Sequence, residues 1–387
     1  MRKIIPIVIV ALCIVAAFVS EIPRMVDRTE NKVVGSVSYM PSSQAFALHK
    51  QLTVVDLHAD SLLWGRDLLE RSTYGHVDIP RLADGNVALQ VFSLPTKSPR
   101  GVNIERNDGT TDNIYWLALV ERWPRDTWGS LTQRALFQAK RLHQFANVAR
   151  GGFVIIQSAS DLSNYLARRQ RNGRLTAGML SIEGAHALDG NLDNLDVLYR
   201  AGYRMMSPSH MFDNDIGGSS AGMEKIGLTE KGRAWVRRME ALHMIIDLAH
   251  ASPKTIDDVL AIATRPPVVS HTGVKGTCNN NRNLSDDQIL AIAAKGGLIG
   301  IGFWDTATCG RSAQAIVRAM RYVSDRVGVE HVALGSDFDG AVTEPFDASG
   351  MVNITEAMLD AGYSEHDIRM IMGENAIRFF KENLPPE

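Results

Sequence analysis

The chain has 387 residues, of which 45% are hydrophobic and 22% are charged, and its formal net charge at pH 7 is −2. These values are ordinary for a globular enzyme with a substantial core. The length suits one large domain or about two to three average ones. The small net charge and the lack of a Lys/Arg run argue against a nucleic-acid partner. The sequence shows no internal repeats and no long low-complexity stretch.

The N-terminal residues differ from the rest of the chain. Arg2 and Lys3 precede an apolar run over residues 4–19, which is typical of a secretory signal or a signal-anchor. Phe18-Val19-Ser20 places a bulky ring where signal cleavage needs a small residue. We therefore favour an uncleaved anchor over residues 1–20, with a cleaved signal peptide as the alternative. The positive-inside rule then predicts export, with an inner-membrane anchor and the catalytic domain in the periplasm or outside the cell.

Beyond a predicted linker over residues 21–45, short apolar runs alternate with amphipathic stretches. The predicted strands cover residues 53–57, 88–94, 178–182, 205–207, 244–248, 267–270, 298–303 and 332–335. Predicted helices between them include residues 230–242, 255–263, 286–295 and 313–327. Alternating strands and helices indicate parallel strands with crossover connections. Eight such units predict an α/β fold, a closed (β/α)₈ TIM barrel, within a domain over residues 46–387.

Two parts of this pattern leave alternatives open. A further apolar run over residues 153–157 competes for a place among the strands, and we expect it outside the barrel. A doubly wound open sheet is the alternative fold, although no GxGxxG follows the first strand. The interval over residues 95–177 predicts a helical insertion. Its Trp116, Trp123 and Trp128 are expected in core packing, with a cap over the barrel or a homodimer contact as alternatives.

Most predicted strands end at a residue that can bind a metal ion. The residues in these positions are His58, Asp60, Glu183, His210, His250, His271 and Asp337. A single histidine at a strand end is most often structural, and HxD alone occurs often by chance. Six strand ends with such residues, on the face where barrel enzymes hold their active sites, instead predict a metal centre.

The residue types suit a hydrolase with two metal ions. Imidazole and carboxylate are the usual ligands of catalytic zinc. His58 and Asp60 can reach one ion together because residues i and i+2 of a strand share a face. Glu183 can give one oxygen to each of two ions, and two such ions can hold a bridging hydroxide and polarise a carbonyl. Asp337, across the barrel, can accept and return a proton.

From about residue 50 to residue 383, the chain resembles the membrane (renal-type) dipeptidase family of the metal-dependent amidohydrolase superfamily. The resemblance rests on the stretches VVDLHAD (54–60), SIEGAH (181–186), SPSH (207–210), IDLAHAS (246–252), VSHT (269–272), CNNNRN (278–283), GSDFDG (335–340) and GENAIR (373–378). It implies a zinc-dependent dipeptidase with two Zn²⁺ ions per chain and dipeptides as substrates.

The same resemblance implies how the metal ligands are divided. His58 and Asp60 are expected to bind the first zinc ion. Glu183 is expected to bridge both ions. His250 and His271 are expected to bind the second ion.

The resemblance also implies the residues that handle the substrate. His210 is expected to donate to the scissile carbonyl oxygen and stabilise the oxyanion. Arg282 is expected to bind the C-terminal carboxylate, a bidentate task suited to guanidinium. Asp337 is expected to bind the free amine and transfer the proton. Cys278 and Cys309 resemble a disulfide pair of the family, which fits an exported protein.

Two features depart from the family pattern. Residues 211–218, next to the expected substrate pocket, are closer to bacterial relatives than to animal ones, which leaves the preferred side chains open. The N-terminal segment differs from a cleaved signal combined with a C-terminal lipid anchor. A related binuclear amidohydrolase acting on another amide or lactam is the alternative activity. A non-catalytic binding protein is disfavoured because no expected ligand is missing.

Overall fold

The computed structural model describes residues 21–35 and 40–387. The predicted anchor over residues 1–20 lies outside the described residues. Among the helices of the two described ranges, none combines the length and the apolarity needed to cross a membrane.

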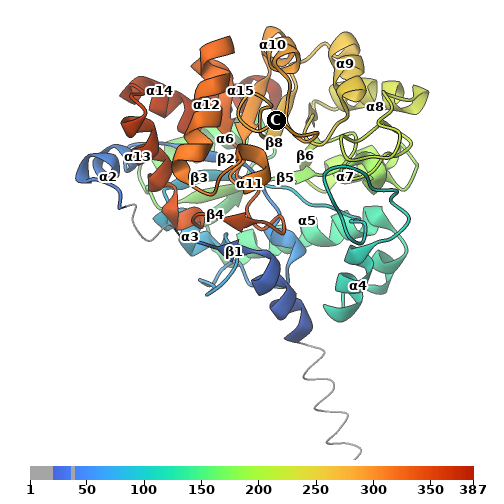
Figure 1. Ribbon diagram of the computed structural model, residues 1–387. Helices are drawn as coiled ribbons and strands as arrows, with labels where there is room; N and C mark the ends of the chain where they lie inside the picture. The colour runs from blue at the N-terminus through green and yellow to red at the C-terminus, as the bar shows by residue number, and fades with distance from the viewer. Residues whose placement is uncertain (1–20, 36–39) are drawn as a thin grey trace, which may run out of the picture.

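The centre of the fold is a ring of parallel strands in chain order (Figure 1). The strands are β2 (Val54–Ala59), β3 (Val87–Phe92), β5 (Thr176–Ile182), β6 (Tyr203–Met206), β7 (Ile245–Ile246), β8 (Val268–Thr272), β9 (Leu298–Ile301) and β10 (Val332–Leu334). Hydrogen bonds join them in the order β7-β6-β5-β3-β2-β10-β9-β8. An isolated parallel bridge between Asp247 and Val268 links the end of β7 to β8. The predicted α/β class with a sheet of the TIM-barrel type is confirmed.

The strands are buried along their whole length, with every residue of β2, β3 and β5 inaccessible to solvent. Helices cover the outer face of the sheet, so both faces exclude water. This is why the strands read as continuous apolar runs in the sequence. All eight predicted runs overlap an observed strand, although β7 has only two residues.

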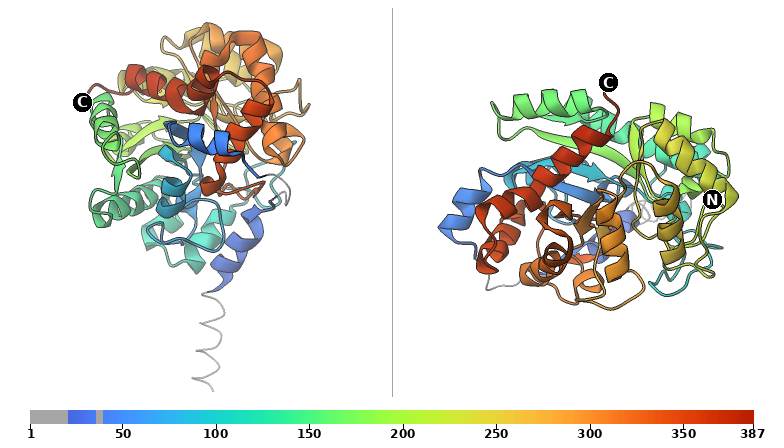
Figure 2. Two further views of the ribbon diagram at one scale, coloured as in Figure 1. Left: turned by 90° about the vertical axis from the view of Figure 1, so that its left-hand side faces the viewer. Right: turned by 90° about the horizontal axis from the view of Figure 1, so that it is seen from above.

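Helices surround the ring, as the view from above shows (Figure 2). They are α3 (Ile79–Asp84), α7 (Asn194–Arg200), α8 (Glu230–Ala241), α9 (Pro253–Ile262), α10 (Asp286–Ala294), α11 (Asp305–Thr308), α12 (Ala313–Val327), α13 (Val352–Asp360), α14 (Glu365–Arg369) and α15 (Asn375–Asn383). The four helices predicted by residue range correspond to α8, α9, α10 and α12. Each begins after a Ser or Thr whose side chain accepts a backbone hydrogen bond of the first turn.

The segment between β3 and β5 is the predicted helical insertion. It contains α4 (Asn113–Val120), α5 (Leu131–Val148), β4 (Phe153–Ile155) and α6 (Ala159–Arg169). Strand β4 pairs only with the start of β5 and lies outside the ring, as expected for residues 153–157. Trp123 packs in a small core with Ile114 and Ala118, whereas the side chain of Trp116 is 55% exposed.

The predicted linker contains regular structure that packs on the barrel. Residues 21–30 are helical, and α2 (Ser43–His49) begins before residue 45. Between them, β1 (Lys32–Val33) pairs in parallel with β11 (Thr343–Glu344). The N-terminal helix and β1 therefore lie beside the chain that follows β10 (Figure 1).

Candidate active site

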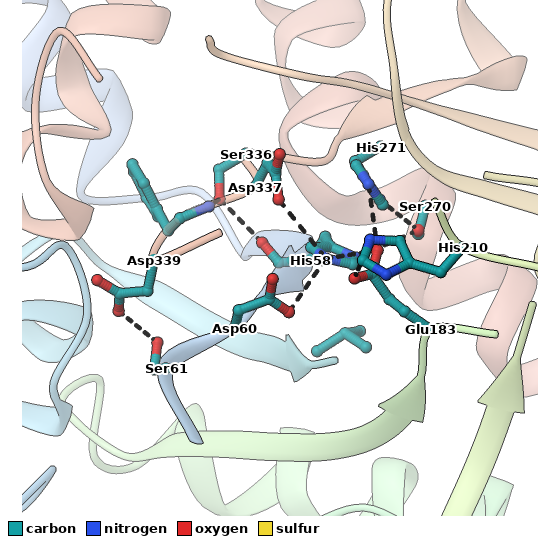
Figure 3. Close-up of polar contacts among 12 residues, drawn as sticks. His58, Asp60, Ser61, Glu183, His210, Ser270, His271, Ser336, Asp337 and Asp339 are labelled. Atoms are coloured by element: carbon teal, nitrogen blue, oxygen red, sulfur yellow. Dashed lines mark hydrogen bonds and ion pairs between the residues drawn. The ribbon is translucent and has the colours of Figure 1, made fainter. Parts of the chain in front are cut away.

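The C-terminal ends of the strands bring the predicted metal ligands and the predicted catalytic residues His210 and Asp337 together in one buried centre (Figure 3). The residues are His58 and Asp60 at the end of β2, Glu183 after β5, His210 after β6, His250 after β7, His271 in β8 and Asp337 after β10. All are buried except Asp337, whose side chain is 13% exposed. Residues that are up to 279 positions apart in the chain thus form one site, because parallel strands end at the same edge.

Glu183 lies at the middle of this centre. Its Oε1 atom is 3.3 Å from His58 Nε2, 3.3 Å from His250 Nε2 and 3.4 Å from His271 Nε2. Its Oε2 atom is 3.2 Å from His210 Nε2. One carboxylate therefore faces four imidazole rings with both of its oxygens.

The other two carboxylates lie on the His58 side of the centre. Asp60 Oδ1 is 3.4 Å and Asp337 Oδ1 is 3.7 Å from His58 Nε2. Figure 3 shows both carboxylates directed towards the His58 ring. His58 is thus shared between Glu183 and this pair of aspartates.

The atoms facing the centre fit a metal ion. His58 Nε2, Asp60 Oδ1 and Glu183 Oε1 are buried and lack a hydrogen-bond partner. A buried polar atom without a partner is costly unless something else binds it. Nitrogen and oxygen ligands without cysteine suit a catalytic divalent ion such as zinc.

Three sets of ligand atoms lie close enough to hold an ion, each within 4.8 Å of one another. They are His58 with Glu183 and His271, Glu183 with His210 and His250, and His58 with Asp60 and Asp337. Glu183 belongs to two sets, as a bridging ligand would. His210 joins one set although it was predicted to contact substrate, so the division of ligands between two ions stays a prediction.

Burial keeps three of the histidines in the form that binds metal. It lowers the pKa of His210, His250 and His271 well below the usual value. Burial also lowers the pKa of His58, but Glu183 and Asp60 outweigh it and raise this pKa to about 10. The same carboxylates that would bind a cation thus favour the protonated, positively charged form of the His58 ring when no cation is bound.

The carboxyl groups repel one another inside the barrel. Burial, with Asp60 next in importance, raises the pKa of Glu183 well above its usual value. Burial likewise raises the pKa of Asp337 to about 7, although His58 and Arg282 lower it. A divalent cation at the centre would offset both effects.

A serine and an aspartate that sequence analysis missed orient two of the histidines. Ser270 Oγ donates to Asp247 Oδ2 at 2.6 Å, and it lies 2.9 Å from His271 Nδ1 and 3.3 Å from His58 Nδ1. Because the Ser270 hydroxyl donates its hydrogen bond to Asp247, its oxygen can only accept from the two rings, and their Nδ1–H groups donate to it. This tautomer leaves both Nε2 lone pairs facing Glu183. The signal was present, since Ser270 precedes His271 directly and Asp247 lies in the fifth strand.

Left-handed backbone directs two side chains into the centre. His250 has a φ of 63° and Asp337 a φ of 69°. Such conformations cost roughly 1–3 kcal/mol for a non-glycine residue and persist only where the surroundings hold them. Strain at these two strand ends is typical of a functional site.

Arg282, which the sequence predicts to bind the substrate carboxylate, lies beside His271 at the edge of the centre. The side chain is buried, one guanidinium nitrogen donates to the His271 carbonyl at 2.8 Å, and the group stands 5.6 Å from the Trp304 ring. Its segment is held by the predicted disulfide between Cys278 and Cys309, which is confirmed, with Cα atoms 5.2 Å apart. Trp304 had no sequence signal beyond its residue type.

A barrel of parallel strands whose C-terminal ends direct four histidines and three carboxylates to one point defines a metal-dependent hydrolase. Residues 42–384 match the membrane dipeptidase family, peptidase family M19, and the chain belongs to this family. It is a metal-dependent dipeptidase, a hydrolase that acts on peptide bonds. The resemblance found in the sequence motifs is confirmed.

Relatives and solved structures agree with this assignment. The chain is 28% identical over 325 residues to dipeptidase verJ of Clonostachys rogersoniana, covering 79% of this chain and 82% of the relative. The crystal structure of dipeptidase AC, a metallopeptidase, is 26% identical, with a TM-score of 0.71, and covers 87% of this chain and 99% of its own. A Rhodobacter sphaeroides metallopeptidase, solved with a phosphinate mimic of the dipeptide L-Ala-D-Ala, is 25% identical, with a TM-score of 0.70 and coverages of 86% and 99%.

Proposed function

We propose that this dipeptidase binds two Zn²⁺ ions and uses them to hydrolyse dipeptides with free ends. The observation that carries the proposal is the position of Glu183, whose two oxygens face four imidazole rings. His58, Asp60, His250 and His271 supply the remaining ligands. Bound there, the ions would polarise the scissile carbonyl and activate water.

Three residues of the chain would handle the substrate. Arg282 offers a guanidinium that makes only one hydrogen bond within the described residues, to the His271 carbonyl. Its free donors suit the C-terminal carboxylate of a dipeptide. His210, beside Glu183, would donate to the oxyanion. Asp337, on the far side of His58, would bind the amine and transfer the proton to the leaving group.

Binding of the substrate carboxylate by Arg282 and of its amine by Asp337 favours short substrates. A site that binds both the amine and the carboxylate of its substrate excludes long peptides, which cannot place both ends in it. The Rhodobacter sphaeroides relative was solved with a mimic of a dipeptide that has a D-residue in second position. We extend this tolerance to the present enzyme and propose that a D-residue is accepted there.

The proposed location is outside the cytoplasm. Residues 1–20 carry the charge and hydropathy pattern of a signal-anchor. The Cys278–Cys309 disulfide suits an oxidising compartment. We propose a membrane-tethered enzyme, with a homodimer through the insertion around Trp116 as a further hypothesis that analytical ultracentrifugation of the detergent-solubilised protein would test.

One experiment tests the proposed activity. The full chain is purified, its metal content is measured, and it is assayed with a panel of dipeptides that includes D-residues in second position. We expect two zinc ions per chain and hydrolysis that stops with chelator and resumes with Zn²⁺. Lack of metal-dependent cleavage of every dipeptide in the panel would overturn the proposal.

A further inference from the structure

The N-terminal segment of residues 21–34, here called the N-terminal clasp, contacts the loop between β10 and β11, residues 335–342, which carries Asp337. The clasp lies outside residues 42–384, the part that matches the dipeptidase family. Its helix, residues 21–30, buries Pro23 and Asp27, and the buried Asn31 follows it directly on the same face, with its amide bonded to the Asp27 carbonyl. An apolar helix face would suffice for simple packing, but two of these three residues are polar.

Asp27 is connected to the active-site loop by an ion-pair chain. Its Oδ2 atom is 2.8 Å from Arg66 Nε, and Arg66 Nη2 is 2.7 Å from Asp339 Oδ1. The three residues are 2%, 6% and 0% exposed. Ser61 also donates to Asp339 at 2.6 Å, and Figure 3 shows Asp339 directed towards Ser61 while Asp337 faces His58.

The clasp also binds the backbone of the same loop. Asn31 Oδ1 accepts a hydrogen bond from the amide of Ala341 at 2.9 Å. The Asp339 amide donates to His76 Nδ1 at 2.9 Å, so the proton of this ring is on Nε2, which donates to the Lys32 carbonyl at 3.0 Å. Strand β1 then pairs with β11 immediately beyond the loop.

The loop needs such support because its backbone is strained. Asp337, Asp339 and Ala341 have φ angles of 69°, 63° and 59°. Three left-handed non-glycine residues at alternating positions persist only when surrounding contacts determine the conformation. The clasp contacts Asp339 through Arg66 and His76, and it contacts Ala341 directly.

We propose that the N-terminal clasp positions Asp337 for catalysis, with Asp27 and Asn31 as positioning residues. The inference rests on the proposed role of Asp337 in binding the amine and moving the proton. Neither residue contacts a predicted metal ligand; Asn31 binds the loop directly, and Asp27 reaches it through Arg66. A displacement of about 1 Å at a reacting group can cost up to about 100-fold in rate.

The test compares Asn31→Ala and Asp27→Asn with Glu30→Gln, an exposed residue of the same helix, in the full chain. Backbone amide exchange of residues 337–344, kcat, KM, metal content and Tm are measured for each. In both clasp variants we expect exchange to accelerate about 10-fold in this loop, with exchange at residues 270–272 and the metal content unchanged. We expect kcat per metal-loaded molecule to fall about 10-fold, whereas Glu30→Gln should match the wild type.

Two results would overturn the proposal. One is loop exchange equal to that of the wild type. The other is an unchanged kcat per metal-loaded molecule in variants whose Tm is lower or whose loop exchanges faster. That result would mean that the clasp stabilises the fold without positioning Asp337. A wild-type protein that cleaves no dipeptide would instead refute the proposed function. In that case the rate of amide exchange in the variants would still show whether the clasp holds the loop.

Discussion

The Nε2 atoms of His250 and His271 lie 2.9 Å apart and project from the ends of the neighbouring strands β7 and β8. Both rings have a pKa far below the usual value because they are buried. Neutral imidazole is the form that binds metal. The pair and Glu183 Oε1, which lies within 3.4 Å of each ring, therefore behave as ligands prepared for a cation.

Metal removal should weaken the fold as well as stop the reaction. An ion present at about 1,000 times its dissociation constant stabilises the native state by roughly 4 kcal/mol. For a chain of this size we expect the chelated protein to melt about 5 °C lower. Differential scanning calorimetry with and without chelator, followed by Zn²⁺ addition, measures the shift. An unchanged Tm would contradict binding at these residues.

Arg282→Ala should impair the binding of substrates with a free C-terminal carboxylate. Hydrogen bonds to a charged group contribute about 1.5–3 kcal/mol each, so KM for dipeptides should rise roughly 100-fold. Dipeptide amides, which lack that charge, should be affected little. The exposed Arg311→Ala serves as control. Little effect on either substrate type would favour the alternative activity on an uncharged amide or lactam, and equal losses for both would contradict a role of Arg282 in carboxylate binding.

Ser270→Ala should reduce metal affinity without removing a ligand. The hydroxyl connects Asp247 to His271 and His58 and fixes the tautomer of both rings. Loss of such a contact typically costs 10- to 100-fold in metal affinity, so we expect roughly that range. Competition with a zinc chelator measures it. Ser163→Ala, on the exposed face of α6, should bind zinc as the wild type does.

Loss of the disulfide should lower stability and loosen the Arg282 segment. The bond joins cysteines 31 positions apart, and a loop of that length is worth about 4 kcal/mol in the chain-entropy description. Chemical denaturation of the Cys278→Ser, Cys309→Ser double variant measures the loss. Reductant should destabilise the wild type to a similar extent and leave the double variant unchanged. KM should rise in parallel, because Arg282 lies inside the closed loop.

The acid sensitivity of the fold should depend on Asp339. Burial alone would raise the pKa of Asp339, but the Arg66 guanidinium beside it outweighs burial and holds this pKa below the usual range. A carboxyl with a lowered folded-state pKa stabilises the protein above its unfolded-state pKa of about 4, and the stabilisation is lost as the pH falls below that value.

The measurement for Asp339 is the free energy of unfolding between pH 5 and pH 3, taken with chelator present so that metal loss does not contribute. We expect the wild type to lose up to about 1.4 kcal/mol per pH unit through this group. Asp339→Asn should remove that part of the slope, and the exposed Asp126→Asn should keep it. Parallel curves for wild type and Asp339→Asn would contradict the assignment.

The barrel and most of its site could be predicted from the sequence because both follow local rules. Strands buried on both faces appear as apolar runs, and the residue that ends such a run lies at the active-site edge. Even the two-residue strand β7 is predicted, because the apolar run over residues 244–248 extends beyond it on both sides. His58, Glu183 and His271 were located in this way before any contact was known.

The N-terminal clasp could not be predicted, because its contacts are long-range and involve ordinary residue types. Asn31 and the Ala341 amide are 310 positions apart, and no periodic pattern connects them. The expected linker was inferred from polar composition, which does not show that Asp27 is buried against Arg66. Ser270 and Asp247 were overlooked for a related reason, since a serine or an aspartate beside a motif is common.

The ring closes between β7 and β8 at Asp247, which forms the bridge to Val268 and also accepts a hydrogen bond from the Ser270 hydroxyl. The residues of the centre lie on both sides of this seam, and they come from β2 at one end of the chain order to β10 at the other. An incomplete or nascent chain therefore cannot assemble the centre. A metal ion that needs residues from both sides of the seam would therefore bind only to a chain whose barrel has closed.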